Sequence, residues 1–140
     1  ILDIIVEGKR LCHCVGSQDR YWDRIQRHEA YILFLRKASA PTTPYYTLEV
    51  EPDGTVRQVR TQFDRQESDI NDAREFLTGW QKVVSMRLTS ADRKEAAASR
   101  ILREQEFEQM RQDNVVIHAG HLAGRRLVDV LTADLMENAA

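Results

Sequence analysis

The chain has 140 residues, a length typical of one domain, and its composition is 42% hydrophobic and 30% charged, as in globular proteins. Its formal net charge is −2, so the chain as a whole lacks the positive charge that draws a protein to nucleic acid or to an anionic membrane. No apolar stretch approaches the ~20 residues of a membrane-spanning helix, and there is no signal-peptide pattern. We therefore expect a cytoplasmic protein that folds without a cofactor.

The first thirty residues predict two short strands and a short helix. Residues 1–6 are rich in β-branched types, and residues 10–15 can return as a second strand after a turn. A helix is then expected over residues 21–28, where Trp22 and Ile25 are three positions apart and would share one apolar face.

Three further strands are expected before residue 65. Residues 30–37 contain five consecutive apolar residues of strand-forming type, which favours a central strand covered on both faces. Residues 45–50 read as the next strand, and residues 55–63 should return antiparallel to it. The Glu-Pro-Asp-Gly turn at residues 51–54 connects them: proline presets φ, aspartate bonds its own backbone, and glycine accepts a positive φ.

After residue 65 the apolar period changes to that of a helix. One helix is predicted over residues 70–88, with Ser68 or Asp69 as its cap, and another over residues 89–112 behind a capping-box signal. The apolar face of this second helix is thin, so it either projects from the body or pairs with another chain. That face comprises Ala98, Ile101, Leu102 and Met110. A last helix is expected within residues 122–135.

Strands followed by helices indicate an α+β fold, a small and mostly antiparallel sheet with C-terminal helices that pack on it or project from it. We interpret residues 1–88 as one α+β domain and residues 89–140 as a helical extension that is not an independent domain. The C-terminal helices could also form a homo-oligomer. Because the sequence begins with Ile1 rather than methionine, we interpret the chain as part of a longer protein.

Both cysteines of the chain lie near its N-terminus, and His13 separates Cys12 from Cys14. Zinc accepts cysteine and histidine, but structural sites use cysteines two to four residues apart, and His118 and His121 are far away in sequence. We therefore predict no metal site. A thiol before a helix would have its thiolate favoured by the helix dipole, yet free cysteines are usually buried, so a buried Cys14 is our preferred interpretation.

The predicted hairpin gathers polar residues on one face. If the turn centres on its Asp-Gly pair, Glu49 lies opposite Gln58, Thr47 lies opposite Arg60, and Arg36 can join them. These side chains could form a ligand site or a salt-bridged surface. A longer loop with a glycine bulge would shift the register by one residue and separate the set.

Basic and aromatic residues surround the same hairpin, and such a mixture can bind single-stranded nucleic acid by charge and stacking. They are Arg36, Lys37, Arg57, Arg60 and Arg65, with Tyr45, Tyr46 and Phe63. Acidic neighbours in the same segments weaken this interpretation.

Four strings occur in a fixed order: HCVGS at residues 13–17, ILFLRK at 32–37, PYYTLEV at 44–50 and QVR at 58–60. Together they resemble the PcfJ-like protein family over roughly residues 5–80. That family takes its name from a protein of a conjugative plasmid transfer region, and its relatives occur on plasmids and in phages.

The resemblance implies a set of site residues and two functional hypotheses. The implied ligand-binding residues are His13, Ser17, Arg36, Thr47, Glu49, Gln58 and Arg60. The preferred hypothesis is an accessory domain of a mobile-element protein that binds nucleic acid or a protein of a transfer complex. The alternative is an enzyme with His13, Cys14 and Glu49 as catalytic candidates, either a thiol hydrolase or a nucleotide- or NAD-using transferase.

Overall fold

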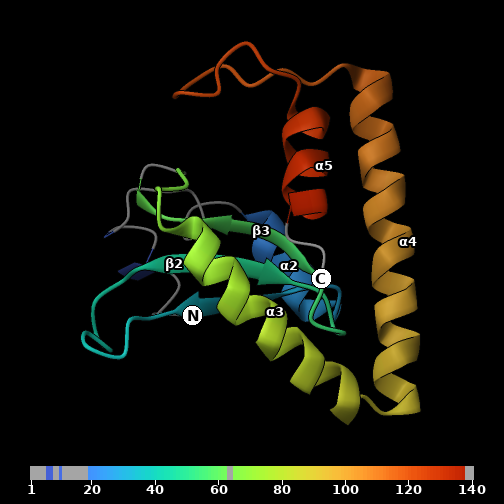
Figure 1. Ribbon diagram of the computed structural model, residues 1–140. Helices are drawn as coiled ribbons and strands as arrows, with labels where there is room; N and C mark the ends of the chain where they lie inside the picture. Colours follow the sequence, from blue (N-terminus) through green and yellow to red (C-terminus); the bar gives the residue numbers. More distant parts are fainter. Residues whose placement is uncertain (1–5, 8–9, 11–18, 63–64, 138–140) are drawn as a thin grey trace.

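The computed structural model of the chain describes residues 6–7, 10, 19–62 and 65–137 (Figure 1). Its elements in chain order are α2 (Asp19–Gln26), β1 (Tyr31–Leu35), β2 (Tyr46–Val50), β3 (Val56–Arg60), α3 (Ile70–Arg87), α4 (Ser90–Asp113) and α5 (Leu127–Glu137). The strands form an antiparallel sheet in the order β1-β2-β3. The predicted α+β fold, a small antiparallel sheet followed by C-terminal helices, is confirmed.

The central strand of this sheet is β2 and not β1. Every residue of β2 is buried, whereas β1 lies at the edge of the described sheet and most of its residues are half-buried. The predicted central position for residues 30–37 is therefore wrong. An apolar run indicates burial, but it does not determine how many neighbouring strands a strand has.

The two strands predicted at the N-terminus are also wrong where the structure describes them. Val6, Glu7 and Arg10 have helical conformation, and the rest of residues 1–6 and 10–15 lies outside the described residues. The Glu7 side chain is fully buried and accepts hydrogen bonds from Arg36 at the end of β1. Tertiary contacts of this kind override the weak β-propensity of a short segment.

The helix α2 buries a different face from the one predicted. Tyr21 and Arg24 are its buried residues, while Trp22 and Ile25 are only half-buried. Arg24 points toward the sheet because it binds the carboxylate of Glu49 there. A polar contact thus orients this helix, and apolar spacing alone could not predict it.

The sheet has one apolar and one polar face. Helix α3 crosses the apolar face (Figure 1) and closes the hydrophobic core, which consists of Tyr46, Leu48, Val50, Val56, Val59, Ile70, Ala73 and Leu77. Thr47 and Glu49 alternate with the core residues of β2 and point to the opposite face. Side chains from α2 and α4 contact that polar face.

The two predicted helix caps have different outcomes. At α4, Thr89 accepts a hydrogen bond from the Asp92 amide, and the Asp92 carboxylate accepts one from the Thr89 amide, so the predicted capping box is confirmed. Asp69 is the N-cap residue of α3, but its side chain caps no helix amide. Its carboxylate instead accepts hydrogen bonds from the hydroxyls of Tyr45 and Tyr46, chiefly the former, which lowers the pKa of Asp69.

Helix α4 packs on the body through a face that is mainly polar. Its buried residues are Ala96, Ser99 and Arg103, whereas Ile101 and Leu102, from the predicted apolar face, are exposed. That predicted face is therefore wrong, because the surface that α4 covers is charged. Among the described helices, none has both the length and the apolar composition needed to cross a membrane.

The connecting turn of the β2–β3 hairpin requires Gly54. Its φ is +90°, and a Cβ atom there would lie 3.3 Å from Cγ1 of Val84 on α3. We expect Gly54→Ala to lower the free energy of unfolding by about 1–2 kcal/mol, because an L side chain is strained at positive φ. Thermal and urea unfolding followed by circular dichroism would measure the change.

Gly79 of α3 is the matched control, because a Cβ atom there meets nothing within 4 Å. Gly79→Ala should raise the free energy of unfolding by about 0.5–1 kcal/mol, since alanine is the better helix former. Equal effects of the two substitutions would contradict the assignment of strain to Gly54.

Candidate functional site

The polar face of the sheet depends on a β-bulge in β3. Thr47 pairs with Arg60 and Glu49 with Gln58, which confirms the predicted register. The register then shifts by one residue, so that Val50 pairs with Val56 and Arg57 is the extra residue. The bulge leaves the predicted pairs intact and turns Arg57 onto the polar face.

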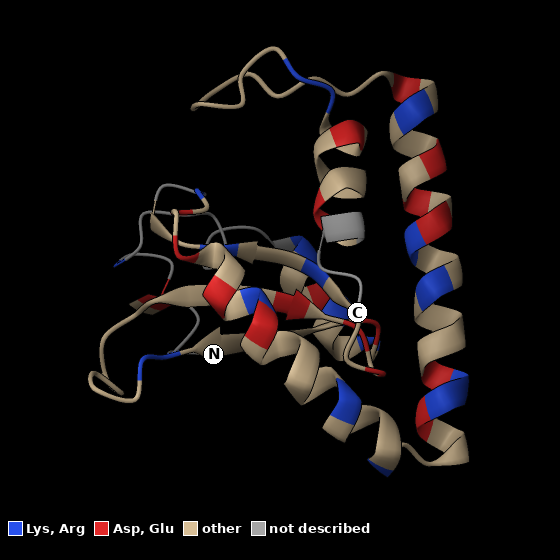
Figure 2. Cartoon of the chain, in the orientation of Figure 1, with Lys and Arg blue, Asp and Glu red and all other residues tan. Residues whose placement is uncertain are grey.

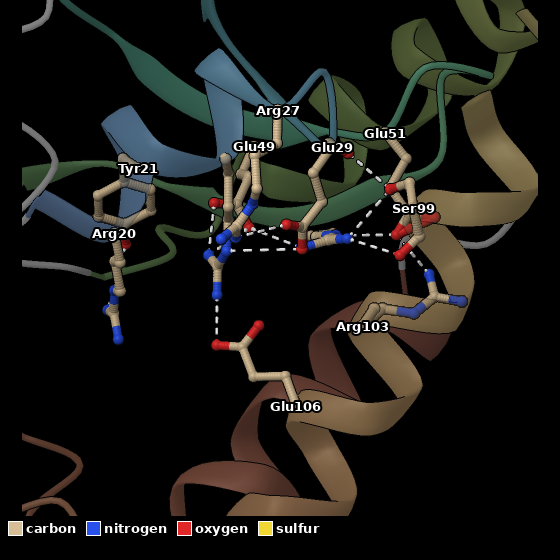
Figure 3. Close-up of polar contacts among 11 residues, drawn as sticks. Arg20, Tyr21, Arg27, Glu29, Glu49, Glu51, Ser99, Arg103 and Glu106 are labelled. Atoms are coloured by element: carbon tan, nitrogen blue, oxygen red, sulfur yellow. Dashed lines mark hydrogen bonds and ion pairs between the residues drawn. The ribbon is translucent and has the colours of Figure 1, made fainter.

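Under α2 and α4 this face holds a group of buried charges that we call the ion network (Figure 3). Its members are Arg24, Glu29, Glu49, Glu51, Arg57, Ser99, Arg103 and Glu106. They come from α2 and the residues that follow it, from the hairpin, and from α4. The ion network therefore joins three parts of the chain that are distant in sequence.

Arg57 lies at the centre of the ion network and is 5% exposed. Its Nε donates to Glu51 at 2.8 Å and its Nη1 donates to Glu29 at 3.2 Å. Its Nη2 donates to both the backbone oxygen and the hydroxyl of Ser99, at 3.2 and 3.1 Å. Arg103 of α4 completes the group by donating to Glu51 at 2.7 Å. Each of the three guanidinium nitrogens of Arg57 thus donates to an acceptor.

Arg24 connects Glu49 of the sheet to Glu106 of α4. Its Nη1 lies 3.2 and 2.9 Å from the two carboxylate oxygens of Glu49, and its Nη2 lies 2.5 Å from Glu106. Burial would lower the pKa of Arg24, but the attraction of these two carboxylates outweighs it and raises the pKa. Arg24 therefore stays charged although it is buried.

Glu51 shows how strongly the ion network is desolvated. Burial raises the pKa of its carboxyl above the ordinary value, even though Arg57 and Arg103 both bind it and oppose that change. A carboxylate in such surroundings depends on its arginine partners to remain charged.

A second group of polar contacts lies beside the first and involves two of the predicted site residues. Arg36 donates to the two carboxylate oxygens of Glu7 at 2.9 and 2.5 Å. The hydroxyl of Thr47 donates to the same carboxylate at 3.2 Å. Arg36 and Thr47 thus meet through Glu7, a residue that the sequence did not single out.

Gln58 and Arg60 lie on β3, opposite Glu49 and Thr47 of β2, and the connection between α4 and α5 leaves a hollow beside them. Two cavities of about 210 and 240 Å³ share Arg60, His121, Leu122 and Val130 as walls. We call them together the basic hollow, because Arg20 and Arg125 also line it. Gln58 and Tyr21 contribute to its polar wall, and Ile117, Leu122, Leu127 and Leu131 to its apolar wall.

The structure places the predicted site residues in three neighbouring environments. Thr47 and Arg36 contact Glu7, Glu49 lies in the ion network, and Gln58 and Arg60 line the basic hollow. His13, Cys14 and Ser17, like Cys12, lie outside the described residues. Within residues 19–62 and 65–137, together with 6, 7 and 10, no group of three or more His, Cys, Asp or Glu side chains could hold a metal ion.

Sequence reasoning missed most of the ion network, although two signals pointed to it. Arg57 stands where strict alternation would place a core residue beside Val59, and a charge at such a position indicates a bulge. In α4, Ser99, Arg103 and Glu106 recur at helical spacing, which marks one polar face for packing. Neither signal identifies the residues that these side chains contact.

In a comparison with protein families, a family model described as PcfJ-like protein matches residues 1–75. This range contains the three strands and the whole HCVGS string, and it ends within α3. Searches of curated proteins and of solved structures found no match to the chain.

Proposed function

The chain belongs to the PcfJ-like protein family, and from that premise we propose that it is an accessory domain of a mobile-element protein that binds single-stranded nucleic acid at the basic hollow. Its place would be the cytoplasm, within a plasmid- or phage-encoded complex. The observation that carries the proposal is the position of Gln58 and Arg60 in a hollow with Arg20 and Arg125.

The chemistry of the basic hollow suits a nucleotide. Arginine presents a planar set of donors that matches the oxygens of a phosphate. Arg20 and Arg125 are both exposed, and Arg20 points away from the ion network (Figure 3). The apolar wall, with Ile117 and Leu122, offers contact to a sugar or a base. The neighbouring helix α4 does not extend this basic surface, because acidic and basic residues are mixed along it (Figure 2).

The enzyme hypothesis has less support from the described residues. Glu49, its carboxylate candidate, is 4% exposed, and both oxygens accept hydrogen bonds from Arg24. A general acid or base must reach the proton that it transfers. Glu49 is thus better suited to holding α2 against the sheet than to contacting a substrate.

Binding of a short fluorescein-labelled single-stranded oligonucleotide of mixed sequence, measured by fluorescence anisotropy, tests the proposal. We expect binding that weakens with salt. Arg125→Ala should weaken it several-fold and reduce the slope of log K against log salt by about 0.7, the value for one lost phosphate contact on a single strand.

Arg93→Ala is the matched control, because Arg93 is an exposed arginine near the start of α4, at the end of that helix remote from the α4–α5 connection (Figure 1). It should leave affinity and salt slope unchanged. The proposal is wrong if the wild-type protein does not bind the oligonucleotide at low salt, or if Arg93→Ala and Arg125→Ala lose affinity equally. Absence of binding would favour a protein of the transfer complex as the partner.

A further inference from the structure

Arg60 differs from the arginines of the ion network in its surroundings. Arg24 contacts three carboxylates, and Arg57 contacts three as well. Arg60 instead lines both cavities of the basic hollow. Its Nη1 donates to the backbone oxygen of Val59 at 3.0 Å, and its Nη2 donates to Asp134. Arg60 is therefore a half-buried arginine whose guanidinium borders open space.

The carboxylate that Arg60 binds comes from the last helix of the chain. Asp134 of α5 is buried and is itself part of the wall of the 240 Å³ cavity. A carboxylate and a phosphate present similar pairs of oxygens to a guanidinium, and both bind it by charge-assisted hydrogen bonds. An anion that entered the hollow would approach the same donors that Asp134 now uses.

Helix α5 is attached in a way that permits this exchange. It has 11 residues, too few to be stable without packing, and Val128 and Val130 are its buried apolar residues. Its connection to α4 contains Gly120 and Gly124, both with positive φ. The position of α5 over β3 thus depends in part on a small apolar contact and on the Arg60–Asp134 pair, besides its contacts with α4.

We infer that Arg60 is the phosphate-binding residue of the basic hollow and that Asp134 occupies it in the free protein. Helix α5 and the ligand then compete for one guanidinium, and binding requires the Asp134 carboxylate to leave. This inference rests on the proposed binding of nucleic acid and assigns to it a residue and an internal competitor.

Asp134→Asn tests the competition in the same anisotropy assay. The amide keeps the shape of the side chain but not its charge, so affinity for the labelled oligonucleotide should rise at least fivefold. The salt slope should grow by about 0.7, because Arg60 becomes available to one more phosphate. Arg60→Gln added to Asp134→Asn should remove the whole gain.

Asp129→Asn is the matched control. Asp129 lies on the same helix, is exposed and pairs with Arg126, so its substitution changes the net charge equally without touching Arg60. It should raise affinity by less than twofold. If Asp134→Asn and Asp129→Asn act equally while the wild type binds, the competition is refuted and the proposed function stands. If neither the wild type nor Asp134→Asn binds, both fall.

A measurement on the wild type decides the matter if Asp134→Asn does not fold. Hydrogen exchange of the α5 backbone amides, at Leu127–Glu137, should accelerate when the oligonucleotide saturates the protein, because the Arg60–Asp134 contact is then broken. Unchanged or slower exchange in α5 on binding would overturn the inference.

Discussion

Arg57→Ala is expected to lower the free energy of unfolding by about 3–5 kcal/mol, the usual loss when one partner of a buried ion pair is removed. Glu29 and Glu51 are both 3% exposed, and each would lose a charged partner at a buried position. Since small domains have about 5–15 kcal/mol of total stability, the variant should be partly unfolded at 37 °C. Urea unfolding with an unchanged slope would measure the loss.

Arg111→Ala supplies the control for Arg57→Ala, because Arg111 pairs with Glu108 on the exposed surface of α4. Its loss should change stability by less than about 0.5 kcal/mol. If both variants unfold at the same urea concentration, the ion network does not contribute as the structure indicates.

The loss in Arg57→Ala should also depend on pH. Burial already raises the pKa of Glu51, and removal of Arg57 should raise it further. A carboxyl whose folded-state pKa is raised destabilises the fold above that pKa, and the penalty disappears as the pH falls toward its ordinary value of about 4.3. The stability difference between Arg57→Ala and wild type should therefore shrink as the pH falls from 7 toward that value.

Tyr46→Ala should have an effect of similar size on the opposite face of the sheet, about 3–5 kcal/mol. The Tyr46 side chain is 0% exposed in the hydrophobic core. Its hydroxyl donates to Asp69 at 3.0 Å and accepts from the Glu67 amide at 3.1 Å. The substitution would thus leave a cavity under α3 and remove two hydrogen bonds near the start of that helix.

Two further variants separate these contributions in the same unfolding experiment. Tyr46→Phe keeps the ring and should lose only about 1 kcal/mol, because it removes the hydroxyl alone. Phe76→Ala removes an aromatic ring from α3 that is 62% exposed, and it should change stability by less than about 0.5 kcal/mol. A loss in Phe76→Ala that matched the loss in Tyr46→Ala would show that the core has been misassigned.

Local chemistry explains which parts of the fold were predictable from the sequence. The Pro-Asp-Gly turn determines where the hairpin reverses, whereas the pairing of Glu49 with Gln58 also depends on the bulge at Arg57, because the pair next to the turn is Val50 with Val56. The capping box joins Thr89 and Asp92, which are three positions apart. The start of α4 could therefore be predicted from a short stretch of sequence. Signals confined to a few consecutive residues were sufficient for these features.

Features that depend on distant residues were not predictable in this way. The bulge at Arg57 is stabilised by Glu29 and Ser99, 28 and 42 positions away along the chain. The basic hollow likewise joins Arg60 to Asp134 of α5, 74 residues later. Polar residues on a helix or strand are usually solvated, so nothing in their local spacing indicated that these would enclose one another.

The ion network has a consequence for how the chain tolerates insertions and deletions. Apolar helix faces can slide by a turn and still bury the same kind of surface, but a shift of α4 by one turn, about 5.4 Å, would leave Arg103 without Glu51. The axial position of α4 is therefore fixed at Ser99, Arg103 and Glu106. The residues from 107 to 113 then act as a spacer of set length between that fixed point and the wall of the basic hollow. One residue added there would rotate everything after it by about 100° and carry Asp134 away from Arg60, while the pairing of the three strands would stay as it is.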